Sequence, residues 1–187
     1  MTGTTDKIIM GIDPGTRILG FGVIHIIGKK VQYEGMGVVN LKNEKDHFVT
    51  LQRIMQEVAA LIEKYSPDEL AVEAPFYGKN PQVMLKLGRA QGAAIAAALQ
   101  KNIPIFEYAP RSIKLSVTGK GAASKEQVAM MAQRLLNIDM PQKYLDATDA
   151  LAIALCHYYQ GTNLVPASGK KGSWELFVKN HPDKISK

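Results

Sequence analysis

The hydrophobic period of the chain changes near residue 45, from two residues to three and four. Residues 7–13 form an apolar run that stops at Asp13 and at Pro14–Gly15, a pair that favours a turn. Residues 19–27 and 31–41 are β-branched and alternating, and the short connection that begins at Gly28 is typical of a hairpin. The chain is therefore predicted to begin with three adjacent antiparallel strands.

Helices and strands alternate in the rest of the chain. The predicted helices span residues 46–65, 80–101, 110–117, 124–138 and 145–159, and the predicted later strands are 69–73 and 103–107. A helix that leads into a strand indicates a crossover into parallel pairing. The predicted fold class is α/β: a mixed five-stranded sheet, with three antiparallel strands followed by parallel additions, flanked by helices.

The composition is that of one compact domain. A length of 187 residues with 46% hydrophobic side chains predicts one core, which we assign to residues 1–160, and a basic, partly ordered tail over residues 161–187. The single cysteine, Cys156, excludes an internal disulfide and a zinc site built from cysteines, and fits a reducing compartment. No apolar stretch approaches membrane-spanning length, so we expect a cytoplasmic protein with no membrane partner.

Four carboxylates stand where this fold would gather them. Asp13 and Glu73 end two apolar strands, and neighbouring strand ends can meet at one crevice of a sheet. Asp146 and Asp149 are three residues apart in an otherwise apolar helix and therefore share one face of it. A cluster of four carboxylates without cations would be strongly repulsive, and divalent metal removes that repulsion.

The ligand type indicates which metal would bind. Oxygen-only ligands suit Mg²⁺ or Mn²⁺, and two such ions can stabilise the attacking and leaving oxygens of a phosphoryl displacement. Each acid also has an ordinary structural explanation. Asp13 can be a turn residue, Asp146 can interact with the helix dipole, and Glu73 can be solvated. Their combination with the adjoining basic window favours a shared site.

The positive charge is concentrated in one window. The whole chain carries a formal charge of +6, which alone indicates a polyanionic partner only weakly. Residues 77–125 contain eight basic side chains and one acidic side chain, and this window lies between Glu73 and Asp146. Nucleic acid is the partner that this partition favours. The basic residues are Lys79, Lys86, Arg89, Lys101, Arg111, Lys114, Lys120 and Lys125.

Four motifs in unbroken order resemble the crossover junction endonuclease RuvC family. They are Gly11–Arg17 with Gly20–Val23, Ala71–Phe76, Lys86–Gly92 and Asp146–Ala154. The resemblance implies an RNase H-like fold, a homodimer and resolution of four-way (Holliday) junction DNA by paired symmetric nicks in recombination and repair. It further implies Mg²⁺ as cofactor, two ions per active site with Mn²⁺ able to substitute, and the RuvA–RuvB branch-migration complex as partner.

The resemblance also implies roles for individual residues. Asp13, Glu73, Asp146 and Asp149 match the family's catalytic metal ligands, and Phe76 matches an aromatic residue that stacks on bases near the crossover, where Tyr77 can assist. Lys114 and Lys125 match lysines near the scissile phosphate, where Lys125 has a catalytic role. The remaining expected DNA contacts neutralise the backbone: Lys79, Lys86, Arg89, Arg111 and Lys120.

Several alternatives stay open at this point. Phe76 can cap the core, any one basic residue can be simply solvated, and the small residues of the helix over 81–101 suit either core packing or self-association. A non-catalytic four-way-junction binding protein is the main alternative function. Residues 11–16 also resemble a phosphate motif of actin-like and sugar-kinase ATPases, but such enzymes need two domains and 187 residues leave room for one.

Overall fold

The structure is a computed structural model that describes residues 6–44, 46–75, 80–139 and 145–161. Its five strands form one sheet in the order β3-β2-β1-β4-β5. Strands β1, β2 and β3 are antiparallel neighbours, while β4 pairs in parallel with β1, and β5 in parallel with β4. The predicted mixed five-stranded sheet is confirmed. The strands are β1 (Asp6–Asp13), β2 (Ile18–Ile27), β3 (Lys30–Asn40), β4 (Glu69–Glu73) and β5 (Ile105–Tyr108).

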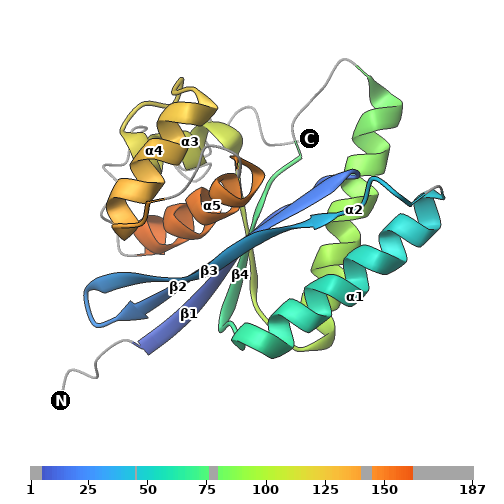
Figure 1. The fold of residues 1–187 in the computed structure, drawn as a ribbon, viewed down its shortest axis with the longest axis horizontal. Coiled ribbons are helices and arrows are strands. Elements are labelled where there is room, and N and C mark those ends of the chain that lie inside the picture. The colour runs from blue at the N-terminus through green and yellow to red at the C-terminus, as the bar shows by residue number, and fades with distance from the viewer. Residues whose placement is uncertain (1–5, 45, 76–79, 140–144, 162–187) are drawn as a thin grey trace, which may run out of the picture.

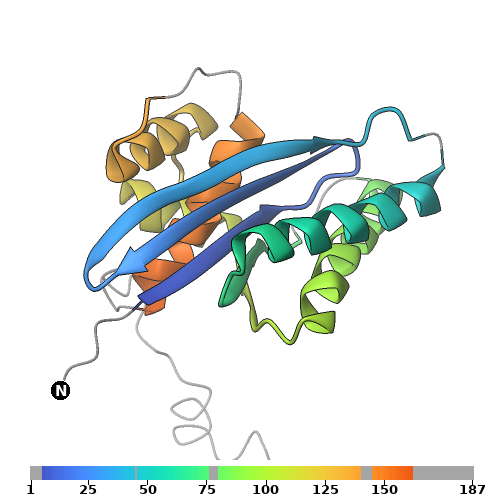
Figure 2. The same cartoon turned by 60° about the horizontal axis from the view of Figure 1, so that its bottom comes forward.

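Helices cover both faces of the sheet (Figures 1 and 2). One face carries α1 (His47–Tyr65) and α2 (Pro81–Gln100), and the other carries α3 (Pro110–Thr118), α4 (Lys125–Leu136) and α5 (Leu145–Gly161). Alternate residues of β1 serve the two layers, as the twofold period of a strand requires. Met10 and Ile12 pack in the core under α1 and α2, whereas Ile9 packs in the core under α5.

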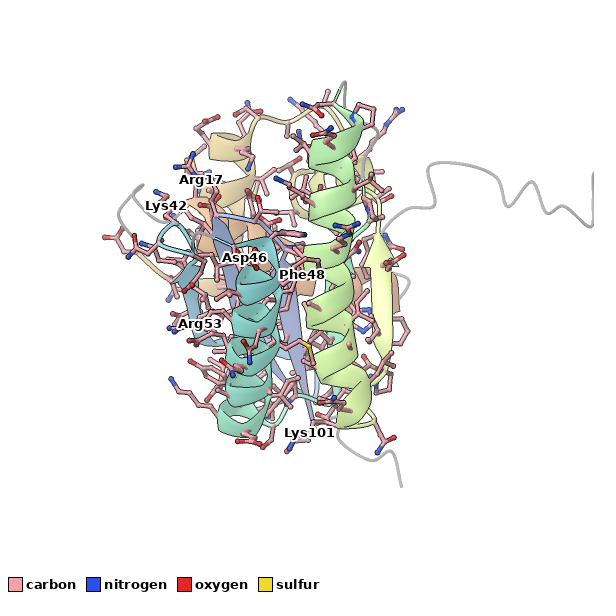
Figure 3. All side chains as sticks on the ribbon, turned by 90° about the vertical axis from the view of Figure 1, so that its right-hand side faces the viewer. Arg17, Lys42, Asp46, Phe48, Arg53 and Lys101 are labelled. Atoms are coloured by element: carbon pink, nitrogen blue, oxygen red, sulfur yellow. The ribbon has the colours of Figure 1, made fainter. Side chains whose placement is uncertain are left out.

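Side-chain caps set the starts of the helices. Asp46 accepts hydrogen bonds from the backbone N–H groups of Phe48 and Val49 at the start of α1, and Asn80 caps α2 in the same way. Ser124 and Gln127 form a reciprocal capping box at the start of α4. Figure 3 shows α1 and α2 side by side, and Lys101, which follows α2, forms an ion pair of 3.0 Å with Glu63 of α1.

Several boundaries differ from the prediction by one or two residues. The fifth strand begins at Ile105 rather than at residue 103, although the carbonyl of Pro104 already accepts a hydrogen bond from the N–H of Leu70. Helix α4 ends at Leu136 rather than at residue 138, because Asn137 adopts a left-handed conformation with φ 52°. Among the described residues, no helix is long and apolar enough to cross a membrane.

Helix α5 touches the backbone of the sheet over a row of glycines. Gly11 of β1 and Gly22 of β2 are directly paired, and Gly20 pairs with Asp13. A Cβ atom on Gly11 would lie 2.0 Å from the carbonyl oxygen of Ala150, and one on Gly20 would lie 2.1 Å from that of Asp146. No other residue fits at these positions without moving the helix, so the glycines set how closely the start of α5 approaches the end of β1.

Polar contacts hold the other end of α5. The Nε2 atom of buried His157 lies 2.5 Å from a carboxylate oxygen of Glu69, whose second oxygen accepts from Lys7, and the Nδ1 atom lies 2.5 Å from the hydroxyl of Tyr108. Burial acts to raise the pKa of Glu69, but the hydrogen bonds from Lys7 and His157 outweigh it and the pKa is lowered. His157 is thus a satisfied core histidine that fixes α5 to the starts of β1 and β4.

Replacing Gly11 with alanine is expected to destabilise the protein by roughly 1–3 kcal/mol, because the added methyl group must displace the backbone of α5. The matched control is Gly88→Ala in α2, where nothing lies within 4 Å of an added Cβ. Alanine favours a helix over glycine there, so the control should gain about 0.5–1 kcal/mol. Urea unfolding of the two variants measures the difference, and equal stability of both would contradict the close contact.

Candidate active site

Three carboxylates meet at one end of the sheet. Asp13 ends β1, while Asp146 and Asp149 lie in the first two turns of α5. One carboxylate oxygen from each lies within 4.8 Å of the others. The predicted shared face of Asp146 and Asp149 therefore does face the end of β1, and the glycine contacts of α5 bring the two elements close enough for the three side chains to meet.

Glu73, the fourth predicted acid, lines two adjoining cavities that it shares with the three aspartates. A cavity of about 340 Å³ is lined by Asp13, Glu73 and Asp146 together with the turn that follows β1. A smaller cavity of about 60 Å³ is lined by Glu73, Asp149, Lys114 and Lys125. Since Glu73 lines both, the four predicted acids lie at one end of the sheet, with Glu73 beside the aspartate cluster rather than within it.

Without a bound cation, the carboxylates of the cluster disfavour one another's ionisation. Burial, and then the charges of Asp149, Glu73 and Asp146, raise the pKa of Asp13 to about 7 against the opposing effect of Lys125. Burial and the charge of Asp149 likewise raise the pKa of Glu73, while Lys125 and Lys114 act to lower it. Two carboxylates that resist ionisation side by side indicate a place built for added positive charge.

Lys125 supplies part of that charge. Its Nζ atom donates a hydrogen bond of 2.7 Å to the Oδ2 atom of Asp149. Burial alone would lower the pKa of Lys125, but the hydrogen bond with Asp149 and the charges of Asp149, Asp13 and Asp146 outweigh burial and raise it. The lysine therefore stays a cation beside the cluster, in the first turn of α4.

A divalent metal fits this donor set. The facing atoms of Asp13, Asp146 and Asp149 are all carboxylate oxygens, the ligands that Mg²⁺ and Mn²⁺ prefer. Burial raises the pKa of Asp13 most, and the charges of Asp149, Glu73 and Asp146 raise it further while Lys125 acts to lower it, so added positive charge would favour the ionised cluster. Asp13, Asp146, Asp149 and Glu73 are the residues that would hold such an ion.

The structure sorts the other sequence-predicted residues into three groups. Lys114 of α3 lines the smaller cavity with Lys125. Four basic residues are exposed and line neither of these two cavities: Lys86, Arg89, Arg111 and Lys120. The remaining three, Phe76, Tyr77 and Lys79, lie outside the described residues, as does the tail after residue 161.

One residue of the larger cavity was missed by sequence reasoning. Gln91 of α2 is buried and lines the cavity with Met84 and Leu87, which lie two turns and one turn earlier in the helix. Its amide contacts the end of β4. The Lys86–Gly92 motif contained the signal, but a glutamine within a helix rich in small residues gives no indication of what it faces.

Comparisons with known proteins agree on one family. A family model described as crossover junction endodeoxyribonuclease RuvC matches residues 9–157. Proteins of that name from Cytophaga hutchinsonii and Porphyromonas gingivalis are 52% and 50% identical over 97% and 96% of this chain, and over 90% and 97% of their own length. The solved structure of Thermus thermophilus RuvC with Holliday junction substrate is similar with a TM-score of 0.78 and 31% identity, over 85% of this chain and 97% of the other.

Replacing Asp13 with asparagine is expected to stabilise the metal-free protein at about pH 8 and to have little effect at about pH 4. The folded-state pKa, about 7, lies above the ordinary 3.8, so the stability associated with protonated Asp13 is complete below pH 3.8 and is lost as the pH rises to about 7. Asparagine does not ionise and escapes this loss. Added Mg²⁺ should reverse the ranking at about pH 8, because the cation offsets the repulsion only in the native chain.

Urea unfolding in a chelator, and then in Mg²⁺, measures this difference. The matched control is Asp139→Asn, an exposed aspartate that lines neither cavity, and it should follow the native chain at every pH. If the unfolding free energies of the native chain and of Asp13→Asn differ by the same amount at acid and alkaline pH, the proposed repulsion within the cluster is contradicted.

Proposed function

The chain belongs to the crossover junction endodeoxyribonuclease RuvC family, and on this premise we propose that it is an endonuclease that resolves Holliday junctions by metal-dependent hydrolysis of phosphodiester bonds. The products are paired symmetric nicks, and the process served is DNA recombination and repair. The fold is the RNase H-like fold of the family, with the mixed sheet at its centre. The observation that carries the proposal is the meeting of Asp13, Asp146 and Asp149 beside Lys125.

The non-catalytic alternative is not favoured. A protein that only binds a junction has no use for carboxylates that repel both one another and the phosphates of DNA. This chain keeps four of them at one end of the sheet, where burial already raises the pKa of Asp13 and Glu73. The relatives that match nearly its full length are also named as endonucleases.

In the proposed reaction Asp13, Glu73, Asp146 and Asp149 hold the metal, two Mg²⁺ ions per active site with Mn²⁺ as a substitute. When bound, the ions supply Lewis-acid stabilisation to the attacking and leaving oxygens. Lys125 stays positive because of its bond to Asp149, so its charge can offset negative charge that gathers on the phosphate. Lys114, which lines the same small cavity, adds a second cation at this edge.

The proposed substrate is four-way junction DNA. Some of the basic residues expected to contact it lie beside the carboxylates, and others lie outside the two cavities. Lys86, Arg89, Arg111 and Lys120 are exposed cations that would neutralise the phosphate backbone outside the cavities. Phe76 and Tyr77 follow β4 closely in sequence, and we retain for Phe76 the role of stacking on a base near the crossover. Lys79 is retained as a backbone contact on the same basis.

We infer that two copies of the chain act together. Leu85, Gly92 and Leu99 are spaced by seven residues and so form one outward stripe on α2, in which the two leucines are 63% and 58% exposed. Phe48, 71% exposed, lies at the start of the neighbouring helix α1 (Figure 3). An apolar surface of this kind suits a homodimer, and a twofold junction requires two equivalent active sites.

The small residues of α2 thus divide between the two uses that the sequence left open. Five alanines, at positions 90, 93, 94, 97 and 98, are buried in the core. Gly88 and Gly92 have open space where a side chain would be. The RuvA–RuvB complex as a partner, and a cytoplasmic location, remain part of this proposal on the basis of family membership.

Cleavage of a synthetic four-way junction tests the function. The native chain in Mg²⁺ is expected to produce paired nicks, and Asp13→Asn is expected to bind the junction while cleaving it at least about 100-fold more slowly, the order expected when a group that stabilises the transition state is lost. Asp139→Asn is the charge-matched control and should cleave at the native rate. Equal cleavage by the Asp13 variant would remove Asp13 from the site, and binding without any cleavage by the native chain would favour the non-catalytic alternative.

Replacing Gly92 with glutamate is expected to dissociate the dimer without unfolding the protomer. An added side chain meets nothing within 4 Å, so only a surface that contacts another molecule can reject it. Met130→Glu on α4 is the control, since Met130 is also half exposed but lies on a different layer. Analytical ultracentrifugation should show a monomer for the first variant and a dimer for the second. A dimeric Gly92 variant would place the interface elsewhere.

A further inference from the structure

Gln91 makes contacts that the reaction as proposed so far does not use. Its side chain is 5% exposed in the middle of α2. The Nε2 atom lies 3.1 Å from the carbonyl oxygen of Glu73 and 3.0 Å from an Oε1 atom of Glu107 on β5. A primary amide has two N–H donors, and the two acceptors use both. One side chain therefore joins α2 to the ends of two parallel strands.

The peptide group between Glu73 and Ala74 is held from both sides. Its carbonyl oxygen accepts from Gln91, and its N–H donates to the carbonyl oxygen of Tyr108 over 2.9 Å. This peptide group is the one that leaves the Cα atom of Glu73, at the last residue of β4. Glu73 also pairs with Tyr108 across the β4–β5 ladder. The ladder and the fixed peptide group together set the direction of the Cα–Cβ bond of Glu73, from which the carboxylate enters the cavity.

Glu107 in turn holds Gln91. Glu107 pairs with Val72 across the β4–β5 ladder, so its position is set by the sheet itself. Its carboxylate forms no ion pair within the described part of the chain, and it accepts a hydrogen bond from Gln91. The glutamine is thus anchored at the sheet, and turning it away from Glu73 would break both of these hydrogen bonds.

We propose that Gln91 is a positioning residue that orients the Glu73 carboxylate toward the aspartate cluster through the Glu73–Ala74 peptide group. The inference rests on the proposed function, because it assigns Glu73 to the metal site. Gln91 does not reach the reacting atoms in this account. Its effect passes through the backbone, so loss of its two hydrogen bonds should weaken metal binding more than it weakens binding of DNA.

The test replaces Gln91 with methionine, which has a similar length and no N–H donor, in the full-length chain. Mn²⁺ binding measured by electron paramagnetic resonance should weaken about tenfold, the lower end of the range for residues that orient metal ligands. The Mg²⁺ concentration for half-maximal junction cleavage should rise by a similar factor. Junction affinity in a chelator should stay within about twofold of native, because no phosphate contact has changed.

Two further variants separate positioning from general stability. Thr50→Val removes a different buried side-chain hydrogen bond, the one from Thr50 to the carbonyl of Asp46 in α1, and should lower the unfolding free energy without changing Mn²⁺ affinity. Gln91→Asn keeps the uncharged amide but draws it back by one methylene group, so it should lose both hydrogen bonds and weaken Mn²⁺ binding as Gln91→Met does.

The possible results distinguish failure of this inference from failure of the proposed function. Native Mn²⁺ affinity in Gln91→Met, native Mn²⁺ affinity in Gln91→Asn, or equal weakening in Thr50→Val would each overturn the positioning role. If the native chain binds metal and cleaves junctions while Gln91→Met matches it, the proposed function stands and only this inference fails. If the native chain binds no divalent metal and cleaves no junction, both fail.

Discussion

The contact between helix α5 and the glycines of β1 and β2 is the constraint on which the active site depends. Because Gly11, Gly20 and Gly22 present no side chains, the backbone of the helix lies directly on the backbone of the sheet. Gly20 faces Asp146 and is paired with Asp13, so the same glycine that admits the helix also sets the distance between two of the carboxylates. At the opposite end, His157 and Glu69 fix the helix to the start of β4. A helix held at both ends cannot slide, and its acids stay against β1.

Because the helix is fixed, the carboxylates at its start stay close to Asp13 and repel it. Asp13, Asp146 and Asp149 could relieve their repulsion if the helix moved away, but the glycine contacts and the buried face of α5 oppose such a movement. The repulsion is relieved in two other ways. Asp13 tends to hold its proton, and Lys125 donates to Asp149. A bound divalent cation would do more than either, since it compensates several carboxylates at once without requiring any of them to protonate.

The sequence predicted the elements well and the contacts between them less well. The hydrophobic period and the strand-ending acids are local signals, and the elements that they predict are confirmed at or near the predicted positions. The tight packing of Gly11 against Ala150 joins positions far apart in the chain, and a glycine in a strand does not reveal what it approaches. Gln91 was missed for the same reason, because its partners Glu73 and Glu107 lie on two strands that come together only in the folded sheet.

The basic window between residues 77 and 125 divides into two kinds of cation in the fold. Lys114 and Lys125 line the small cavity beside the carboxylates and interact with them at short range, although Lys125 is itself exposed. Lys86, Arg89, Arg111 and Lys120 are exposed, and their attraction for a phosphate backbone falls as salt rises. A polyanion would therefore be attracted to the protein by the four exposed residues, and it would contact Lys114 and Lys125 only at the cavity. The carboxylates repel DNA on their own, and a bound divalent cation together with the two lysines would offset that repulsion.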